Sequence, residues 1–172
     1  GDENDSEYSC SSSDDASVVC SVEGDQLTVD PSLDFHGSVL ITVTVTDDGG
    51  LSDDIDFVLT VDPVNDAPII SGQIELTTNE ETSITIVFSD LFVEDVDNDF
   101  PEGFVLTVLD SGDYSEYYSV DGTTVIPGLD IDGLMVVPVY VNDGEVDNNE
   151  SDIFNLEINV INVNDAPILG LV

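Results

Sequence analysis

Alternation of apolar and polar residues is the main structural signal along this chain. Residues 39–46 read VLITVTVT, and residues 152–160 read DIFNLEINV, in which Phe, Leu, Ile and Val alternate with Asn, Glu and Asn. The segment SITIVF at 83–88 has the same spacing. A period of two predicts β-strands with one buried face. We find no comparable stripe at helical spacing, so the chain is expected to be all-β.

Clusters of Gly, Asn, Asp and Pro separate these segments, as turns do between short strands. Seven strands in roughly 100 residues are typical of an antiparallel β-sandwich of the immunoglobulin-like type. Pro138 falls inside the sixth strand and predicts a bulge or a free edge there, because proline cannot donate to a ladder. The expected strands are near 72–78, 83–89, 103–109, 115–120, 123–126, 134–141 and 153–161.

An internal repeat divides the chain. VNDAPI occurs at 64–69 and at 163–168, and PSLDFHG at 31–37 matches PGLDIDG at 127–133. A self-similar unit of about 100 residues predicts tandem domains. The first copy matches only the later part of the second, so the first sandwich is expected to lack its first two strands. The expected domains are a partial sandwich at 1–66, a complete sandwich at 67–166, and a segment at 167–172 that begins a next unit or donates a strand to a neighbouring copy.

Charge is one-sided in this chain. It has 39 Asp and Glu, no Lys or Arg, and a net charge of −39, while 41% hydrophobic residues suffice for a core. A compact state with this charge repels itself, so either salt screens the acids, as in a halophile, or bound cations neutralise them. Binding to nucleic acid or to an anionic membrane is not expected. Direct membrane insertion is not expected either, because no apolar run approaches 18 residues.

Cys10 and Cys20 are the two cysteines of the chain. A disulfide between them suits an oxidising, extracellular compartment. Free thiols are the alternative, and a soft-metal site is less well supported because the other ligands are missing.

Acidic and amide residues are expected to gather at the two ends of the second sandwich. At each end they come from segments far apart in the sequence, and such oxygen donors suit Ca²⁺, which takes six to eight oxygen ligands. The alternative is that these are ordinary solvated turns, because Asp and Asn favour turns on their own. The candidate ligands are Asn65, Asp66, Asp95, Asp97, Asp99 and Asp143 at one end, and Glu80, Glu81, Asn164 and Asp165 at the other.

The motifs resemble the bacterial cadherin-like tandem repeats of large surface adhesins. The resemblance is carried by VNDAP before Ile168, NEET at 79–82, DVD at 95–97 and a looser glycine-bounded strand motif at 133–144. It implies an extracellular immunoglobulin-like sandwich with calcium at the domain junctions. Ala67 and Ala166 stand where many cadherin linkers have a second Asn, which removes one amide ligand.

The expected function is that of a calcium-stabilised, extracellular rigid spacer in an adhesin or a fibre. Its expected partners are neighbouring repeats or identical subunits joined head to tail, with a surface glycan or protein as a further ligand. We do not expect an enzyme. One alternative is a filament subunit completed by donor-strand exchange. Another is a carbohydrate-binding module of a secreted enzyme, for which Tyr114, Tyr117 and Tyr118 would form the sugar-stacking surface.

Overall fold

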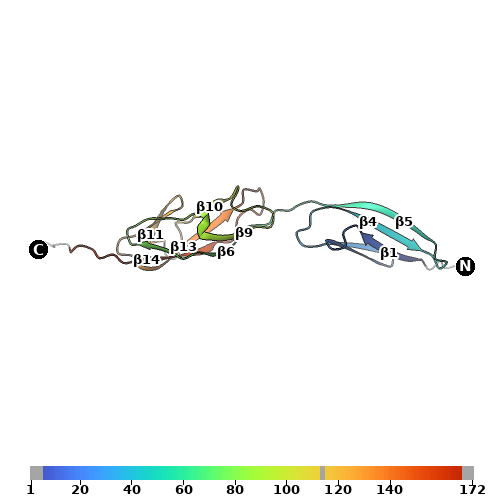
Figure 1. Cartoon of the computed structure of the whole chain (residues 1–172), viewed down its shortest axis with the longest axis horizontal. Helices are drawn as coiled ribbons and strands as arrows, with labels where there is room; N and C mark the ends of the chain where they lie inside the picture. Colours follow the sequence, from blue (N-terminus) through green and yellow to red (C-terminus); the bar gives the residue numbers. More distant parts are fainter. Residues whose placement is uncertain (1–5, 113–114, 168–172) are drawn as a thin grey trace. The chain divides into compact units, whose positions relative to one another are not determined.

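The computed structural model describes residues 6–112 and 115–167 and divides the chain into two compact units (Figure 1). Unit 1 extends to Val64 and unit 2 begins at Asn65. Strands dominate both units, and the only helical element of the described residues is one short 3₁₀ turn. The segment expected to begin a next unit or to donate a strand lies, after Pro167, outside the described residues.

Unit 1 has five described strands in two sheets. One antiparallel sheet has the order β1-β4-β5, whose strands run side by side in Figure 1, and the hairpin β2-β3 forms the other. Val18, Val39 and Ile41 are buried between them, and a disulfide joins Cys10 of β1 to Cys20 of β2 across the two sheets. The strands are β1 (Glu7–Ser12), β2 (Val18–Glu23), β3 (Gln26–Pro31), β4 (Gly37–Thr46) and β5 (Ser52–Val61).

Unit 2 is a β-sandwich. One sheet has the order β10-β13-β14-β7, and the facing strands form the sheets β11-β12-β8 and β6-β9. The apolar face of the alternating segment at 152–160 is buried as predicted, with Leu156 and Ile158 fully inaccessible. The elements are β6 (Ile69–Gln73), β7 (Leu76–Asn79), β8 (Ile84–Thr85), η1 (Phe88–Asp90), β9 (Leu91–Glu94), β10 (Val105–Val108), β11 (Tyr118–Asp121), β12 (Thr124–Pro127), β13 (Gly133–Asn142) and β14 (Phe154–Ile161).

Two expected strands are interrupted. The segment 72–78 is divided between β6 and β7, and the segment 83–89 holds only β8 before the chain turns through η1 into β9. The turn is made by Asp90, whose side chain accepts a hydrogen bond from the Val87 N–H at 2.9 Å. The interruption lets β8 pair with β12 while β9 pairs with β6. A further departure from a wholly antiparallel sandwich is the parallel pairing of β7 with β14.

Strand β13 runs through Pro138 without a bulge, opposite Asn155 of β14. On its other side the β10 ladder ends at Val108, and the Pro138 carbonyl accepts a hydrogen bond from the Leu109 N–H. The nitrogen and the carbonyl of a strand residue point to the same neighbour. The missing proline donor therefore faces the side where the β10 ladder has just ended, and the strand shows no bulge there.

The repeated turn motif adopts the same backbone in both units. Asp34 and Asp130 are left-handed, with φ of 59° and 55°, and the glycines that end the motif, Gly37 and Gly133, have φ of 125° and 98°. Asp tolerates the left-handed region, and the second conformation favours glycine. The motif therefore requires a backbone geometry and not a particular side chain before its final glycine. That side chain is His36 in one unit and Asp132 in the other.

Candidate functional site

At its N-terminal end, unit 2 brings its first residues against two distant loops. The Asn65 amide donates to the Asp143 carboxylate at 3.0 Å, and the Asp66 backbone N–H donates to the Asp97 carboxylate at 2.7 Å. Asn148 closes the group by donating to the Asn65 carbonyl at 3.0 Å. These bonds link four of the six residues expected at this end, and Asp95 joins them by accepting from the Asp97 backbone N–H. We call the group formed by Asn65, Asp66, Asp95, Asp97, Asn98 and Asp143 the Asp95 cluster.

Asp95 organises the loop after β9. Its Oδ1 accepts hydrogen bonds from the N–H groups of Asp97, at 2.9 Å, and Asn98, at 2.7 Å. This is the local turn that an Asp side chain forms with its own backbone. The other carboxylate oxygen of Asp95, Oδ2, and the amide oxygen of Asn98 are buried and have no hydrogen-bond partner among the described residues. Buried polar atoms are normally paired, so these two oxygens are candidates for a partner from solution, which can be a water molecule or a cation.

Asp143 supplies the carboxylate from the loop after β13. It is buried, with 5% of its surface exposed. One of its oxygens accepts from Asn65 and the other from the Glu145 N–H at 2.8 Å. The loop passes close to the one after β9: a Cβ atom on Gly144 would lie 3.2 Å from the Gly103 carbonyl oxygen. The absence of a side chain at Gly144 therefore lets the two acidic loops approach each other closely.

At the C-terminal end of unit 2, Glu80 is the central residue. Only 4% of its surface is exposed, and its Oε1 accepts hydrogen bonds from the Asn162 amide, at 3.0 Å, and from the Val163 N–H. Its Oε2 is buried without a partner in the part of the chain that the structure describes. We call Glu80, Asn162 and Val163 the Glu80 cluster.

Other expected ligands stay outside these clusters. Asp99, Glu81, Asn164 and Asp165 are exposed. Glu81 is left-handed, with φ of 58°, at the turn that directs its neighbour Glu80 inward. The Asn164 amide donates to the adjacent Asp165 carbonyl at 3.0 Å. Across residues 6–112 and 115–167, no three His, Cys, Asp or Glu side chains are arranged around one point in the way that a metal requires.

Sequence reasoning missed Asn98 and Asn162. Asn98 lies inside the acidic loop, and Asn162 directly precedes the repeated VNDAP motif, so both were adjacent to recognised signals. Tertiary packing decides which amide or carboxylate in such a loop becomes buried. The alternation of apolar and polar residues along the chain does not predict that choice.

The clusters have the donor chemistry of a hard-cation site. Their unpaired atoms are carboxylate and amide oxygens, the ligand types that Ca²⁺ prefers and Mg²⁺ accepts. A buried carboxylate oxygen is normally balanced by Lys or Arg, and this chain has neither. The chemistry of these unpaired oxygens fits a hard cation, although no three acidic side chains surround one point among the described residues.

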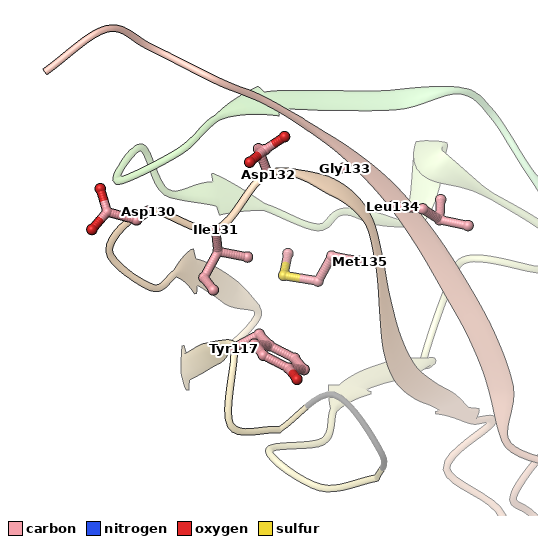
Figure 2. Close-up of a pocket in the computed structure, with 7 residues that line it drawn as sticks. All are labelled: Tyr117, Asp130, Ile131, Asp132, Gly133, Leu134 and Met135. Carbon is pink, nitrogen blue, oxygen red and sulfur yellow. The ribbon is translucent and has the colours of Figure 1, made fainter.

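Of the tyrosines expected to form a sugar-stacking surface, the structure describes Tyr117, which is exposed, and Tyr118, which is buried. Tyr118 is in the core, and its hydroxyl donates toward the carbonyls of Ser111, at 3.0 Å, and Leu109, at 3.2 Å. Tyr114 lies outside the described residues. Tyr117 borders a pocket of about 270 Å³, and Figure 2 shows its ring, Ile131 and Met135 around a common space while the Asp130 carboxylate points away. Tyr118 is therefore excluded from stacking, and binding of a glycan at Tyr117 stays a prediction.

Among known proteins, solved structures are similar to this chain in fold. No protein-family model matches the chain, and no curated protein does. Cadherin domains 1–4 of protocadherin gamma B7 have a TM-score of 0.46 at 16% identity, over 92% of this chain and 42% of that one. The human desmocollin-1 ectodomain has a TM-score of 0.41 at 12% identity, and the match covers 93% of this chain and 35% of that one. The fibronectin(III)-like modules of Clostridium thermocellum CbhA have a TM-score of 0.27 at 14% identity, and the match covers 90% of this chain and 84% of that one.

The chain spans about two fifths of that protocadherin and about a third of the desmocollin. These identities and TM-scores are too low to transfer a ligand, an activity or a partner. No helix among the described residues is long and apolar enough to cross a membrane.

Proposed function

We propose that this chain is a calcium-stabilised structural repeat segment of an extracellular protein and acts as a stiff spacer rather than as an enzyme. One observation carries the proposal: both ends of unit 2 bury acid or amide oxygens without a partner, in a chain that has no cationic Lys or Arg. A divalent cation at each end is the simplest source of the missing positive charge.

Asp95, Asp97 and Asn98 are the residues we expect to hold the ion at the N-terminal end, with Asn65, Asp66 and Asp143 around them. At the C-terminal end we expect Glu80, assisted by Asn162. Ca²⁺ would supply charge neutralisation and a rigid link between loops, with backbone carbonyls and water completing its shell.

The mechanical role follows from which segments the ions would contact. Asn65 and Asp66 are the first residues of unit 2, and Asn162 and Val163 follow its last strand. Fixing both segments to the sandwich limits the directions in which the chain can enter and leave the unit. The proline after each Asn-Asp pair restricts the backbone further by fixing φ. Neighbouring repeats, or copies of the chain joined head to tail, are the partners that such a spacer needs.

Thermal unfolding of the whole chain tests this proposal. We expect the melting temperature in EDTA to rise with millimolar Ca²⁺ by more than it does with equal Mg²⁺ or with NaCl matched for ionic strength. An equal rise with NaCl would show that the acids are only screened and would reject the calcium site in favour of salt adaptation.

A further inference from the structure

The pocket beside Tyr117 lies at the turn that the two units share. In unit 2 the Gly128 N–H donates to the Tyr117 carbonyl at 2.7 Å, and in unit 1 the Ser32 N–H donates to the Ser17 carbonyl at 2.7 Å. The left-handed Asp and the closing glycine of the repeated motif follow in both units. The backbone around the pocket therefore belongs to the repeat, and the lining side chains can be compared position by position.

The side chains at this turn differ between the units. Phe35 of unit 1 packs against the core of that unit, and the smaller Ile131 has the matching place in unit 2. Ser17 of unit 1 corresponds to Tyr117. The pocket of about 270 Å³ is bordered by Ile131, Tyr117 and Met135, whose side chains surround a common space in Figure 2. The turn does not require these lining residues, because unit 1 forms the same turn with others.

Close packing holds the walls of the pocket in place. A Cβ atom on Gly128 would lie 3.1 Å from the Tyr117 carbonyl oxygen and 3.3 Å from Cγ1 of Ile131. Glycine at this position therefore lets the segments that carry Tyr117 and Ile131 approach each other. Met135 is 2% exposed and belongs to the core of unit 2. The pocket is thus formed by packed segments before a ligand enters, as small-ligand sites usually are.

The lining side chains offer apolar surface and hydrogen-bond acceptors. Asp130 and Asp132 border the pocket and are exposed, and the Asp130 carboxylate points away from the common space in Figure 2. Among the described residues that line the pocket, the Tyr117 hydroxyl is the one side-chain donor. A neutral sugar carries acceptors that need donors from its site, whereas a cationic group donates only. The lining therefore suits a ligand with an apolar part and a cationic head.

We infer that this pocket binds the side chain of an arginine from a partner protein. The guanidinium group stacks on the Tyr117 ring and pairs with the Asp132 carboxylate, because arginine combines planar stacking with carboxylate recognition. The apolar stem of the arginine packs on Ile131 and Met135, as stems of long cationic side chains do on apolar surface.

Size and charge favour this occupant. The pocket is smaller than the roughly 300–1,000 Å³ of sites for drug-sized ligands, so it takes one side chain rather than a larger molecule. The net charge of −39 attracts a basic partner, and this chain has no Lys or Arg of its own to fill the pocket. The inference goes beyond the proposed function and uses none of the proposed calcium ligands.

The test uses the single methionine of the chain, Met135. With its methyl group labelled with carbon-13, the NMR spectrum has one methionine methyl signal, from the wall of the pocket. The probe is N-acetyl-arginine amide, added to the full chain at physiological salt with millimolar Ca²⁺. We expect a saturable shift of the signal, and the same result in EDTA. The neutral isostere N-acetyl-citrulline amide should bind about tenfold more weakly or less, because it lacks the charge.

Three chain variants locate the bound probe. Ile131→Phe introduces the residue that unit 1 has at this turn, so the variant is expected to fold with its ring in the pocket, and it should abolish the shift. Leu129→Phe is the matched control, because it adds the same ring at a position that is 69% exposed and does not line the pocket. It should bind like wild type. Asp132→Ser should weaken binding of the arginine probe by about threefold or more, and leave that of the citrulline probe unchanged.

Four results would overturn the inference: no saturable shift with the arginine probe, equal affinity for the citrulline probe, equal binding by Ile131→Phe and Leu129→Phe, or unchanged binding by Asp132→Ser. A saturable shift with methyl glycosides and none with the arginine probe would also overturn it and assign the pocket to a glycan. If Ile131→Phe does not fold, the citrulline comparison and Asp132→Ser decide the question.

Discussion

Replacing Asp95 by Asn separates the two roles of this side chain. The variant keeps an oxygen at the Oδ1 position, which accepts the Asp97 and Asn98 N–H groups, so the loop retains its turn. It replaces the buried, unpaired Oδ2 by an amide NH₂ and removes one negative charge. A buried charge without a partner costs more than a buried neutral amide, for which the penalty is about 1–3 kcal/mol. Without divalent cation, Asp95→Asn should therefore equal or exceed the wild-type stability.

With calcium the order should reverse. A ligand at 100 times its dissociation constant stabilises the folded state by about 2.7 kcal/mol per site. For a unit of this size, that is a rise of roughly 10–20 °C in melting temperature. Asp95→Asn should lose most of the contribution of the N-terminal site, because a neutral amide is a weaker ligand for a hard cation than a carboxylate is.

The assay is calorimetry of wild type and variant in EDTA and in millimolar Ca²⁺. Asp47→Asn is the matched control: Asp47 is also half-buried, and its Oδ1 accepts the Leu51 N–H at 2.8 Å, yet it has no buried unpaired oxygen. If calcium stabilises Asp95→Asn as much as it stabilises wild type and Asp47→Asn, Asp95 does not bind the ion and the assignment of this cluster is refuted.

Three further predictions concern the core, the disulfide and pH. Leu156→Ala should destabilise unit 2 by about 2–5 kcal/mol, whereas Phe57→Ala should cost unit 1 clearly less because its face is open, as urea unfolding will measure. Reduction of the disulfide, or the double variant Cys10→Ser with Cys20→Ser, should destabilise unit 1 by about 2–3 kcal/mol in the same assay. An unchanged free energy of unfolding would refute the idea that the disulfide between the two sheets stabilises unit 1. Burial, with a smaller contribution from Asp110, raises the pKa of Tyr118. The neutral phenol is then favoured in the folded state, so stability is retained below pH of about 10 and lost as pH rises through the folded pKa. Spectrophotometric titration should show one tyrosine ionising late, and Tyr118→Phe should remove that late step.

Sequence alternation predicted the fold well because burial in a sandwich follows a period of two. The segments at 39–46 and 152–160 became β4 and β14, with their apolar faces inward. The pattern through residues 83–94 did not reveal that this stretch serves two partners. At the interruption the Asp90 carboxylate accepts a hydrogen bond from the Val87 N–H, and the sequence pattern does not identify that partner.

The candidate site was predicted in outline but not atom by atom. Asn65, Asp66, Asp97 and Asp143 meet because loops at one end of a sandwich converge, which topology alone implies. Burial of one Asp95 oxygen depends on side-chain packing in the loop after β9, which a single sequence does not encode visibly. The same holds at the other end, where Glu80 is buried and Glu81 is exposed although the two are adjacent and chemically alike.

Isothermal titration of Ca²⁺ into the metal-free chain at 150 mM NaCl tests the central claim most directly. We expect saturable binding with dissociation constants no weaker than about 10⁻³ M, the range of extracellular calcium modules, and loss of that binding in a variant that combines Asp95→Asn with Glu80→Gln. Absence of saturable binding at this salt concentration, or unchanged binding in the double variant, would contradict the account.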